Sequence, residues 1–288
     1  MNTAEDILND GGNCIIIIMD ILLGGLIMNT IQAIVLGLIQ GLTEFLPISS
    51  SGHLVLFQKI FGITEPTLIF DTMVHVGTLA AVVTVLWKEI FSLLKKPFQK
   101  LTWLLIAGTI PTGIIGIMFK DSFEAMYKSG STLGFEFLAT GVIILFAERL
   151  STGRKHIKET SYLDAAFIGV MQGAAILPAV SRSGLTISGA LLRGLDREFA
   201  AKFSFLLSIP AILGAAVFQV KDIFEVGGGS IITVPIVAGT LAAAAAGYFS
   251  IRFMIVLLKK GSMRYFSYYV FAVGTLVIID QYITHLFF

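Results

Sequence analysis

The sequence predicts an all-α integral membrane protein that is an inverted-topology repeat, with six full transmembrane helices and two broken, re-entrant helical hairpins. Three observations lead to this fold class. The chain of 288 residues is 56% hydrophobic and only 14% charged, with a mean hydropathy of +0.87, and long apolar runs at this composition are typical of membrane proteins. Two of the apolar runs are interrupted in the middle. The interrupted runs occupy corresponding places in two halves of the chain, as in proteins with inverted repeats.

Residues 1–28 are predicted to be an N-terminal extension whose role the sequence does not define. Their head is acidic, unlike the basic start of a signal peptide. The apolar run from Ile15 to Met28 contains Asp20 and is short for a membrane span. We therefore expect residues 29–288 to form a single membrane domain.

Six stretches approach the roughly 20 apolar residues that a helix needs to cross a bilayer. They are 69–87, 101–119, 131–147, 203–220, 231–251 and 266–286. Two further apolar stretches, 31–61 and 163–195, are broken by Pro, Ser and Gly, and each half is too short to span. These two stretches are predicted to be discontinuous hairpins.

A nearly constant offset relates the two halves of the chain. The segment AIVLGLIQG, which starts at Ala33, matches AAFIGVMQG, which starts at Ala165. The tripeptide AGT occurs at 107–109 and again at 238–240. Such offsets indicate a duplicated unit, and the predicted repeats cover about 31–148 and 163–280.

Lysine and arginine predict the orientation. Four basic residues lie in each of the connections 88–100, 148–161 and 252–264, and fewer lie in the others. These three connections are therefore expected in the cytoplasm. Each half then has a hairpin followed by three spans, and because three is odd the second half is inverted. The two hairpins should enter from opposite faces and meet near the midplane.

The polar residues of the breaks predict an anion site. In TEFLPISSSGHLVLF, Pro47 ends one half-helix and the serines begin the next, and helix N-termini attract anions. PAVSRSGLT in the second hairpin adds Arg182, whose guanidinium group can hold a phosphate with two hydrogen bonds. A charged arginine costs free energy inside a membrane, so its presence there indicates a functional role. The residues expected to bind the phosphate are Ser49, Ser51, Gly52, Ser181, Ser183, Gly184 and Thr186.

Structural roles compete with each of these assignments. Serine and glycine in membrane helices often serve only to allow close packing. Glu44 could instead be a protonated packing residue. Arg182 could instead be an anchor whose charged end reaches the membrane surface. His75, on the next span, suits a core position as well as a site. The recurrence of the polar cluster in both halves favours function.

Three segments resemble the undecaprenyl-pyrophosphate phosphatase family, also called the bacitracin-resistance family. They are QGLTEFLPISSSGHL (Gln40–Leu54), PAVSRSGLTISGALLRG (Pro178–Gly194) and FSFLLSIPAILGA (Phe203–Ala215). The resemblance implies a multi-pass protein of the plasma membrane with its active site on the outer side. It also implies dephosphorylation of undecaprenyl pyrophosphate to the monophosphate, which recycles the lipid carrier for cell-wall synthesis and confers bacitracin resistance.

The resemblance also implies site residues and a divalent cation, Mg or Ca. Matched by motif, the catalytic candidates are Glu44, Ser50, His53 and Arg182. Gln40 stands where the family has a first glutamate, and it shares a helical face with Glu44. The expected metal ligand is therefore Glu44, with Gln40 as a second, weaker candidate.

The function predicted is hydrolysis of a polyprenyl pyrophosphate by a membrane lipid phosphatase. Ser50 is the candidate nucleophile, activated by His53 or Glu44, and attack by water activated by Glu44 is the alternative. The expected partners are the lipid substrate, the membrane and a second copy of the chain in a homodimer, with no nucleic acid. The rival function is that of a polyprenyl-phosphate flippase or anion transporter of the same architecture.

Overall fold

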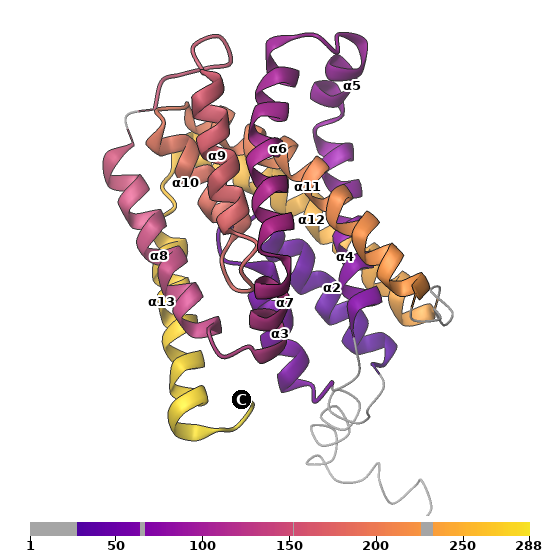
Figure 1. Cartoon of the computed structure of the whole chain (residues 1–288). Coiled ribbons are helices and arrows are strands. Elements are labelled where there is room, and N and C mark those ends of the chain that lie inside the picture. The colour runs from indigo at the N-terminus through magenta and orange to yellow at the C-terminus, as the bar shows by residue number, and fades with distance from the viewer. Residues whose placement is uncertain (1–27, 64–66, 152, 226–232) are drawn as a thin grey trace, which may run out of the picture.

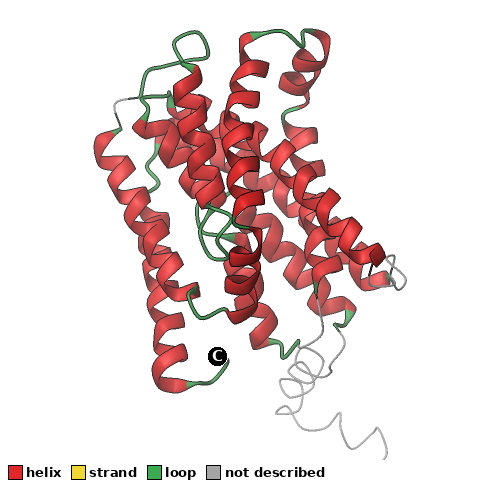
Figure 2. Ribbon diagram, in the orientation of Figure 1, coloured by secondary structure: helices red, strands yellow, loops and turns green. Residues whose placement is uncertain are grey.

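The structure is a computed structural model, and it describes residues 28–63, 67–151, 153–225 and 233–288. These residues form a bundle of helices, with no strand among them. The prediction for residues 1–28 lies outside the described residues, except for Met28. Figures 1 and 2 show long helices side by side, and several loops lie within the bundle rather than at its ends.

The helices follow one another without long connections in the described part of the chain. The first half contains α2 (Thr30–Glu44), α3 (Ser50–Ile60), α4 (Leu68–Val85), α5 (Trp87–Lys95), α6 (Lys100–Met118), α7 (Lys120–Ser129) and α8 (Leu133–Leu150). The second half contains α9 (Tyr162–Ala174), α10 (Arg182–Leu192), α11 (Arg197–Glu225), α12 (Val234–Lys260), α13 (Arg264–Ile279) and the π-helical turn η1 (Asp280–Thr284).

Five of the six predicted spans are helices long and apolar enough to cross a membrane, namely α4, α6, α11, α12 and α13. The sixth prediction, 131–147, falls on α8, which has 18 residues. Three of them, Glu136, Glu148 and Arg149, are charged. Glu136 and Glu148 are buried in the protein, which reduces the cost of carrying them in an apolar helix.

Two short helices lie where only connections were predicted. In α5, Ile90 and Leu93 pack against the main hydrophobic core, and Lys95 lies at the helix end. Helix α7 ends at Gly130, which adopts the left-handed conformation that favours glycine. Both helices are too short to span a bilayer, so they add structure to the connections and leave the spans unchanged.

The predicted breaks in the two hairpins are confirmed. Helix α2 ends at Glu44 and α3 begins at Ser50, while α9 ends at Ala174 and α10 begins at Arg182. The first helix of each hairpin starts with a capping box, from Asn29 and from Ser161. One face of α2 is buried, and the opposite row of side chains is apolar and exposed: Ile31, Ile34, Leu38 and Leu42. Such a row suits contact with lipid.

Glycines let each hairpin approach the opposite half of the chain. A Cβ added at Gly37 on α2 would lie 2.1 Å from the carbonyl oxygen of Gly239 on α12. A Cβ added at Gly169 on α9 would lie 2.0 Å from the carbonyl oxygen of Gly108 on α6. Gly37 and Gly169 are partners in the predicted repeat, as are Gly108 and Gly239. Backbones this close leave no room for a side chain at Gly37, Gly169 or Gly239, and little at Gly108.

The basic helix ends are tied together by ion pairs. Arg197 at the start of α11 holds Glu148 of α8 at 2.8 Å, and Lys202 of α11 holds Glu89 of α5 at 3.1 Å. Lys259 of α12 reaches Glu198 at 3.0 Å. These ion pairs bring together α5 and the last turns of α8 and α12, which belong to the three basic connections. The three connections therefore lie at one end of the bundle, as the orientation prediction requires.

Candidate functional site

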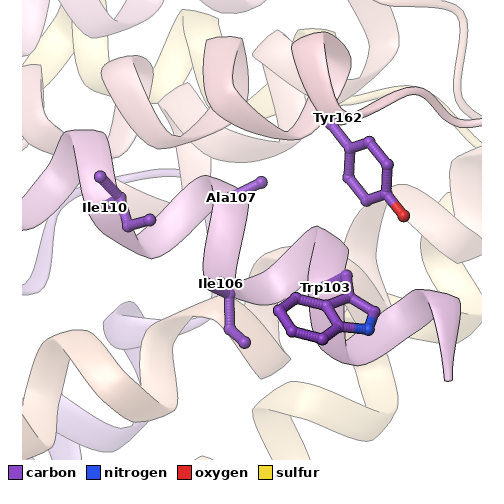
Figure 3. Close-up of a pocket in the computed structure, with 5 residues that line it drawn as sticks. All are labelled: Trp103, Ile106, Ala107, Ile110 and Tyr162. Atoms are coloured by element: carbon purple, nitrogen blue, oxygen red, sulfur yellow. The ribbon is translucent and has the colours of Figure 1, made fainter. Parts of the chain in front are cut away.

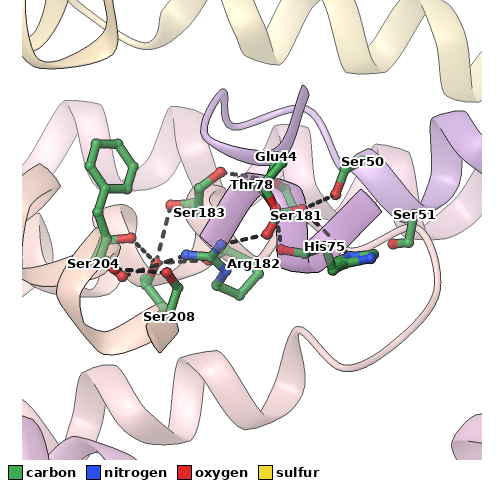
Figure 4. Close-up of polar contacts among 12 residues, drawn as sticks. Glu44, Ser50, Ser51, His75, Thr78, Ser181, Arg182, Ser183, Ser204 and Ser208 are labelled. Carbon is green, nitrogen blue, oxygen red and sulfur yellow. Dashed lines mark hydrogen bonds and ion pairs between the residues drawn. The ribbon is translucent and has the colours of Figure 1, made fainter. Parts of the chain in front are cut away.

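Glu44 is the centre of the polar cluster, and the two hairpin breaks supply its partners. It is the last residue of α2 and is buried. Its Oε1 accepts a hydrogen bond from Nη2 of Arg182 at 2.6 Å. Its Oε2 accepts a hydrogen bond from the hydroxyl of Ser50. Figure 4 shows Ser50 and Arg182 converging on this carboxylate from different segments of the chain.

Ser50 and Arg182 are equivalent residues of the two repeats. Each is the first residue of the second helix of its hairpin, and the two are 132 positions apart. The first turn of a helix presents backbone N–H groups and the positive end of the helix dipole. Glu44 is thus held between two helix starts, and the position equivalent to it in the second hairpin is Ile176. The duplicated scaffold therefore carries one carboxylate, one serine and one arginine.

Two more side chains approach the same carboxylate oxygen. Gln40 donates from Nε2 to Oε2 of Glu44 at 3.0 Å, which confirms that both residues share a helical face. His75 on α4 places Nε2 3.7 Å from Oε2 of Glu44. Its Nδ1 lies 2.6 Å from the carbonyl oxygen of Asp71, and because a carbonyl only accepts, Nδ1 carries a proton.

Arg182 is supported by α11. Its Nη1 lies 3.5 Å from the carbonyl oxygen of Ser204, and the hydroxyl of Ser204 is 2.6 Å from that of Thr186. Thr186 also donates to the carbonyl oxygen of Arg182 at 2.8 Å. A guanidinium group has five N–H donors, so the bond to Glu44 leaves donors on Arg182 for a phosphoryl group.

Four of the predicted phosphate ligands form the N-caps of α3 and α10, two as caps and two as the donors that they satisfy. The hydroxyl of Ser49 accepts from the N–H of Gly52 at 3.2 Å, and that of Ser181 accepts from Gly184 at 3.0 Å. These are ordinary N-cap hydrogen bonds. Ser49 adopts a φ of 68°, a conformation that is costly for a residue with a side chain. Their role in binding phosphate stays a prediction.

Ser51 and Ser183 reach across to the opposite hairpin. Ser51 donates its hydroxyl proton to the carbonyl oxygen of Pro178. Ser183 donates to the carbonyl oxygen of Leu46 at 2.8 Å. These two bonds join the breaks directly to each other.

The ring nitrogens of His53 contact groups other than the Ser50 hydroxyl. Nδ1 of His53 lies 2.6 Å from the carbonyl oxygen of Ser49, and Nε2 lies 2.8 Å from the hydroxyl of Tyr269 on α13. The imidazole stacks on the Tyr269 ring and meets Phe137 edge-on. Because both ring nitrogens already have partners, His53 is arranged to hold the backbone of Ser49, and Glu44 is the residue that faces Ser50.

Three residues near Glu44 and His53 are not among the site residues that the sequence predicts. The sequence leaves His75 open between a core and a site position, and it gives no specific signal for Ser204 or Tyr269. Their sequence signal is weak, because a lone polar residue in an apolar helix is common. His75 was the most detectable, as it is an ionisable residue inside a predicted span.

The donor set near Glu44 offers a divalent ion few protein ligands. Within the described residues no three His, Cys, Asp or Glu side chains group as a metal site. Glu44 Oε1 and Oε2 face Arg182 and Ser50. Oε1 of Gln40, by contrast, is buried and lacks a hydrogen-bond partner, and Mg²⁺ and Ca²⁺ favour such oxygen ligands. The residues therefore fit an ion held by Glu44 and Gln40 with most of its ligands from elsewhere.

An apolar hollow on the surface lies between α6 and α9. Figure 3 shows the residues that line it: Trp103, Ile106, Ala107, Ile110 and Tyr162. None of these side chains carries a charge or a nucleophile suited to phosphate chemistry. This hollow therefore offers an apolar surface and no group for phosphate chemistry.

A helical bundle with apolar spans, in which Glu44, Ser50 and Arg182 meet between two broken hairpins, defines a membrane-embedded multi-pass protein. The chain belongs to the family described as "Bacitracin resistance protein BacA", whose sequence model matches residues 33–276.

Similar proteins carry a consistent name. A protein of Carboxydothermus hydrogenoformans named undecaprenyl-diphosphatase is 56% identical over 256 residues, which cover 88% of this chain and 98% of that protein. A protein of Bacillus thuringiensis named undecaprenyl-diphosphatase 4 is 51% identical, over 90% of this chain and all of that protein. A third, undecaprenyl-diphosphatase of Alkaliphilus metalliredigens, is 46% identical over 88% of this chain.

Proposed function

We propose that this chain is a membrane phosphatase that hydrolyses undecaprenyl pyrophosphate to undecaprenyl phosphate and inorganic phosphate. The observation that carries the proposal is the contact of Ser50 and Arg182 with the two oxygens of the same carboxylate, Glu44. A nucleophile, its base and a cation are together in one buried place, which is what phosphoryl transfer requires. The product is the lipid carrier of cell-wall synthesis, and its recycling accounts for bacitracin resistance.

In the proposed mechanism Ser50 is the nucleophile. Its Oγ attacks the terminal phosphorus while Glu44 accepts the hydroxyl proton. The bond between that phosphorus and the bridging oxygen breaks, and undecaprenyl phosphate leaves. Water then hydrolyses the phosphoserine, which releases phosphate and restores the hydroxyl. Arg182 and the N–H groups at the helix starts neutralise charge on the transferred group.

The proposed setting is an inverted repeat, with two re-entrant hairpins and six spans, α8 being the sixth. The equivalent glycine crossings support this arrangement, since α2 meets α12 while α9 meets α6. The shared end of the basic connections supports a cytoplasmic location for that end. We place the protein in the plasma membrane with its site opening to the outer side, where the pyrophosphate is released.

A divalent cation belongs to the proposal as a co-ligand of the substrate. When bound, it would neutralise phosphate charge. Glu44 and the unpartnered Oε1 of Gln40 are the protein oxygens that would hold it. Mg²⁺ commonly keeps water and substrate phosphates as most of its ligands, so the ion is expected to bind weakly without substrate. A homodimer stays a prediction.

Phosphate release tests the function. Purified protein in detergent is incubated with undecaprenyl pyrophosphate, and inorganic phosphate and the monophosphate should appear in equal amounts. Glu44→Gln should lower the rate at least about 10²-fold, because a general base contributes 10²–10⁴-fold. A wild-type protein with no turnover would instead indicate a carrier, which moves its ligand between compartments without changing it.

An acid quench tests the nucleophile. Rapid quenching of the wild type with labelled substrate should trap a phosphoserine at Ser50, located by peptide mass spectrometry. Ser50→Ala should lose the trapped label and nearly all turnover. Absence of label together with substantial turnover in Ser50→Ala would assign the attack to water activated by Glu44.

A further inference from the structure

Two hydrogen bonds join the broken hairpins, and their donors are equivalent under the repeat. Ser51 donates to the carbonyl oxygen of Pro178, and Ser183 donates to that of Leu46. Ser183 lies 132 positions after Ser51, and the acceptors lie one position apart in the match of Leu46-Pro47 with Leu177-Pro178. Each donor therefore sits on one hairpin and its acceptor on the other, in a reciprocal pair. We call these two bonds the cross-ties.

Each cross-tie is one residue away from a proposed catalytic group. Ser51 follows Ser50, and Ser183 follows Arg182. Each acceptor lies in the break of the opposite hairpin, and Leu46 is two residues after Glu44. Glu44 and Ser50 belong to the first hairpin and Arg182 to the second, so a shift of one hairpin against the other would separate Arg182 from the carboxylate that Ser50 also contacts.

We propose that Ser51 and Ser183 are positioning residues, which lock the two hairpins so that Arg182 of the second hairpin meets Glu44 and Ser50 of the first. This rests on the proposed phosphatase function and deepens it, because it gives two predicted phosphate ligands a different task. Their hydroxyl protons are committed to backbone carbonyls. The remaining contacts of these hydroxyls, with Ser49 and Ser181, are long at 3.4 Å, so the cross-ties are their main bonds.

The cross-ties differ from the other polar contacts at the breaks. The N-cap bonds of Ser49 and Ser181 stay within their own hairpins. Among the contacts described for these residues, only the cross-ties join a serine hydroxyl of one break to a backbone carbonyl of the other. Because catalytic geometry tolerates little displacement, their loss should slow the chemical step and leave phosphate affinity unchanged.

The test compares kcat and KM in substitutions that differ only in the hydroxyl. At the half-buried Ser51, Ser51→Thr keeps the hydroxyl, whereas Ser51→Val has nearly the same shape without it. At the buried Ser183, Ser183→Ala removes the hydroxyl. Ser188→Ala is the matched control, because Ser188 lies on the same helix, is fully buried and has a hydroxyl without a hydrogen-bond partner.

Ser51→Val and Ser183→Ala should each lower kcat about tenfold, the effect of losing a hydrogen bond of ordinary strength, with KM and the inhibition constant of inorganic phosphate unchanged. Ser51→Thr and Ser188→Ala should keep kcat within about twofold. If KM and the phosphate inhibition constant rise while kcat holds, the serines bind phosphate and the proposal is overturned.

Unchanged kinetics in Ser51→Val would overturn it as well. If Ser183→Ala fails to fold, as judged by gel filtration in detergent, the two Ser51 variants alone decide the outcome. An inactive wild type would refute the phosphatase function itself. Normal wild-type turnover, together with unchanged kcat in both Ser51 variants, would refute only the positioning role of the cross-ties.

Discussion

At the scale of single residues, the site depends on how three side chains share one carboxylate. Glu44 is buried, and a buried carboxylate needs a compensating charge. Arg182 provides it, and Ser50 and Gln40 contribute hydrogen bonds to the other oxygen. The pairing of Glu44 with Arg182 joins α2 to α10, so the ion pair connects the two halves of the molecule.

Replacing Arg182 tests this pairing. Arg182→Ala removes the proposed phosphoryl ligand and leaves Glu44 without its cation, so kcat should fall by about 10²–10³-fold, as when one transition-state donor is removed. Arg182→Lys should recover only part of the rate, because an ammonium cannot make the bidentate contact. The rates are measured by phosphate release on protein shown to be folded. Near-normal turnover in Arg182→Ala would remove Arg182 from the site.

Replacing Gln40 tests the proposed role of a divalent ion. In Gln40→Glu a second carboxylate would face Glu44 across one helical turn. The two carboxylates would repel each other in the absence of an ion, and together they would bind a divalent ion more tightly. The variant should therefore need less Mg²⁺ or Ca²⁺ for half-maximal activity. Its melting temperature without substrate should also rise on addition of the ion, more than that of the wild type. An unchanged response in both measurements would show that position 40 does not face the ion.

At the scale of helices, close crossings and helix starts determine where the breaks lie. Each hairpin packs its first helix against the opposite half through a glycine: Gly37 on Gly239, and Gly169 on Gly108. The second helix of each hairpin begins with a serine N-cap. A distortion at either crossing should shift one hairpin relative to the other and so disturb the contact between Arg182 and Glu44.

Alanine substitutions test the crossings. Gly37→Ala and Gly169→Ala should each destabilise the protein by about 1–3 kcal/mol, the usual cost of overpacking, because the added carbon would strike a backbone carbonyl. Gly113→Ala on α6 is the control. Its added carbon meets no atom within 4 Å, so it should be neutral or stabilise by up to about 1 kcal/mol. Thermal unfolding in detergent measures the difference, and equal stability of all three variants would contradict the described crossings.

At the scale of the whole molecule, ion pairs gather the basic connections at one end. Arg197, Lys202 and Lys259 tie the ends of α5, α8, α11 and α12 to one another. The opposite end is closed by the C-terminal turn, where Gln281 donates to the carbonyl oxygen of Gly130. The bundle therefore has a basic end and an opposite end, which gives its orientation a physical basis.

Cysteine labelling tests that orientation. After replacement of the native Cys14, a cysteine placed at Lys96 or Lys155 should be labelled by a thiol reagent only when the cytoplasmic side is accessible. One placed at the exposed Ser131 should react with an impermeant reagent on intact cells. The reverse pattern would place the basic end outside and contradict a site that opens to the outer face.

The sequence by itself determined the helical membrane class, the two breaks and the residues at their centre. Apolar runs, serine-rich helix starts and the repeated offset are local or periodic signals, so they are readable without knowledge of packing. The contact of Gln40 with Glu44 was likewise predictable, because residues four apart share a helical face. The short helices α5 and α7 were missed because their signal is amphipathic and brief.

Only the tertiary structure decided which of the candidate residues meet. His53, three residues after Ser50, turns to Tyr269 of α13, while His75 approaches Glu44 from a separate helix. Ser51 and Ser183 were indistinguishable from their neighbours as phosphate ligands until their carbonyl partners on the opposite hairpin were known. These contacts join residues far apart in the chain, and their geometry depends on how the helices of the two halves pack, which no local pattern encodes.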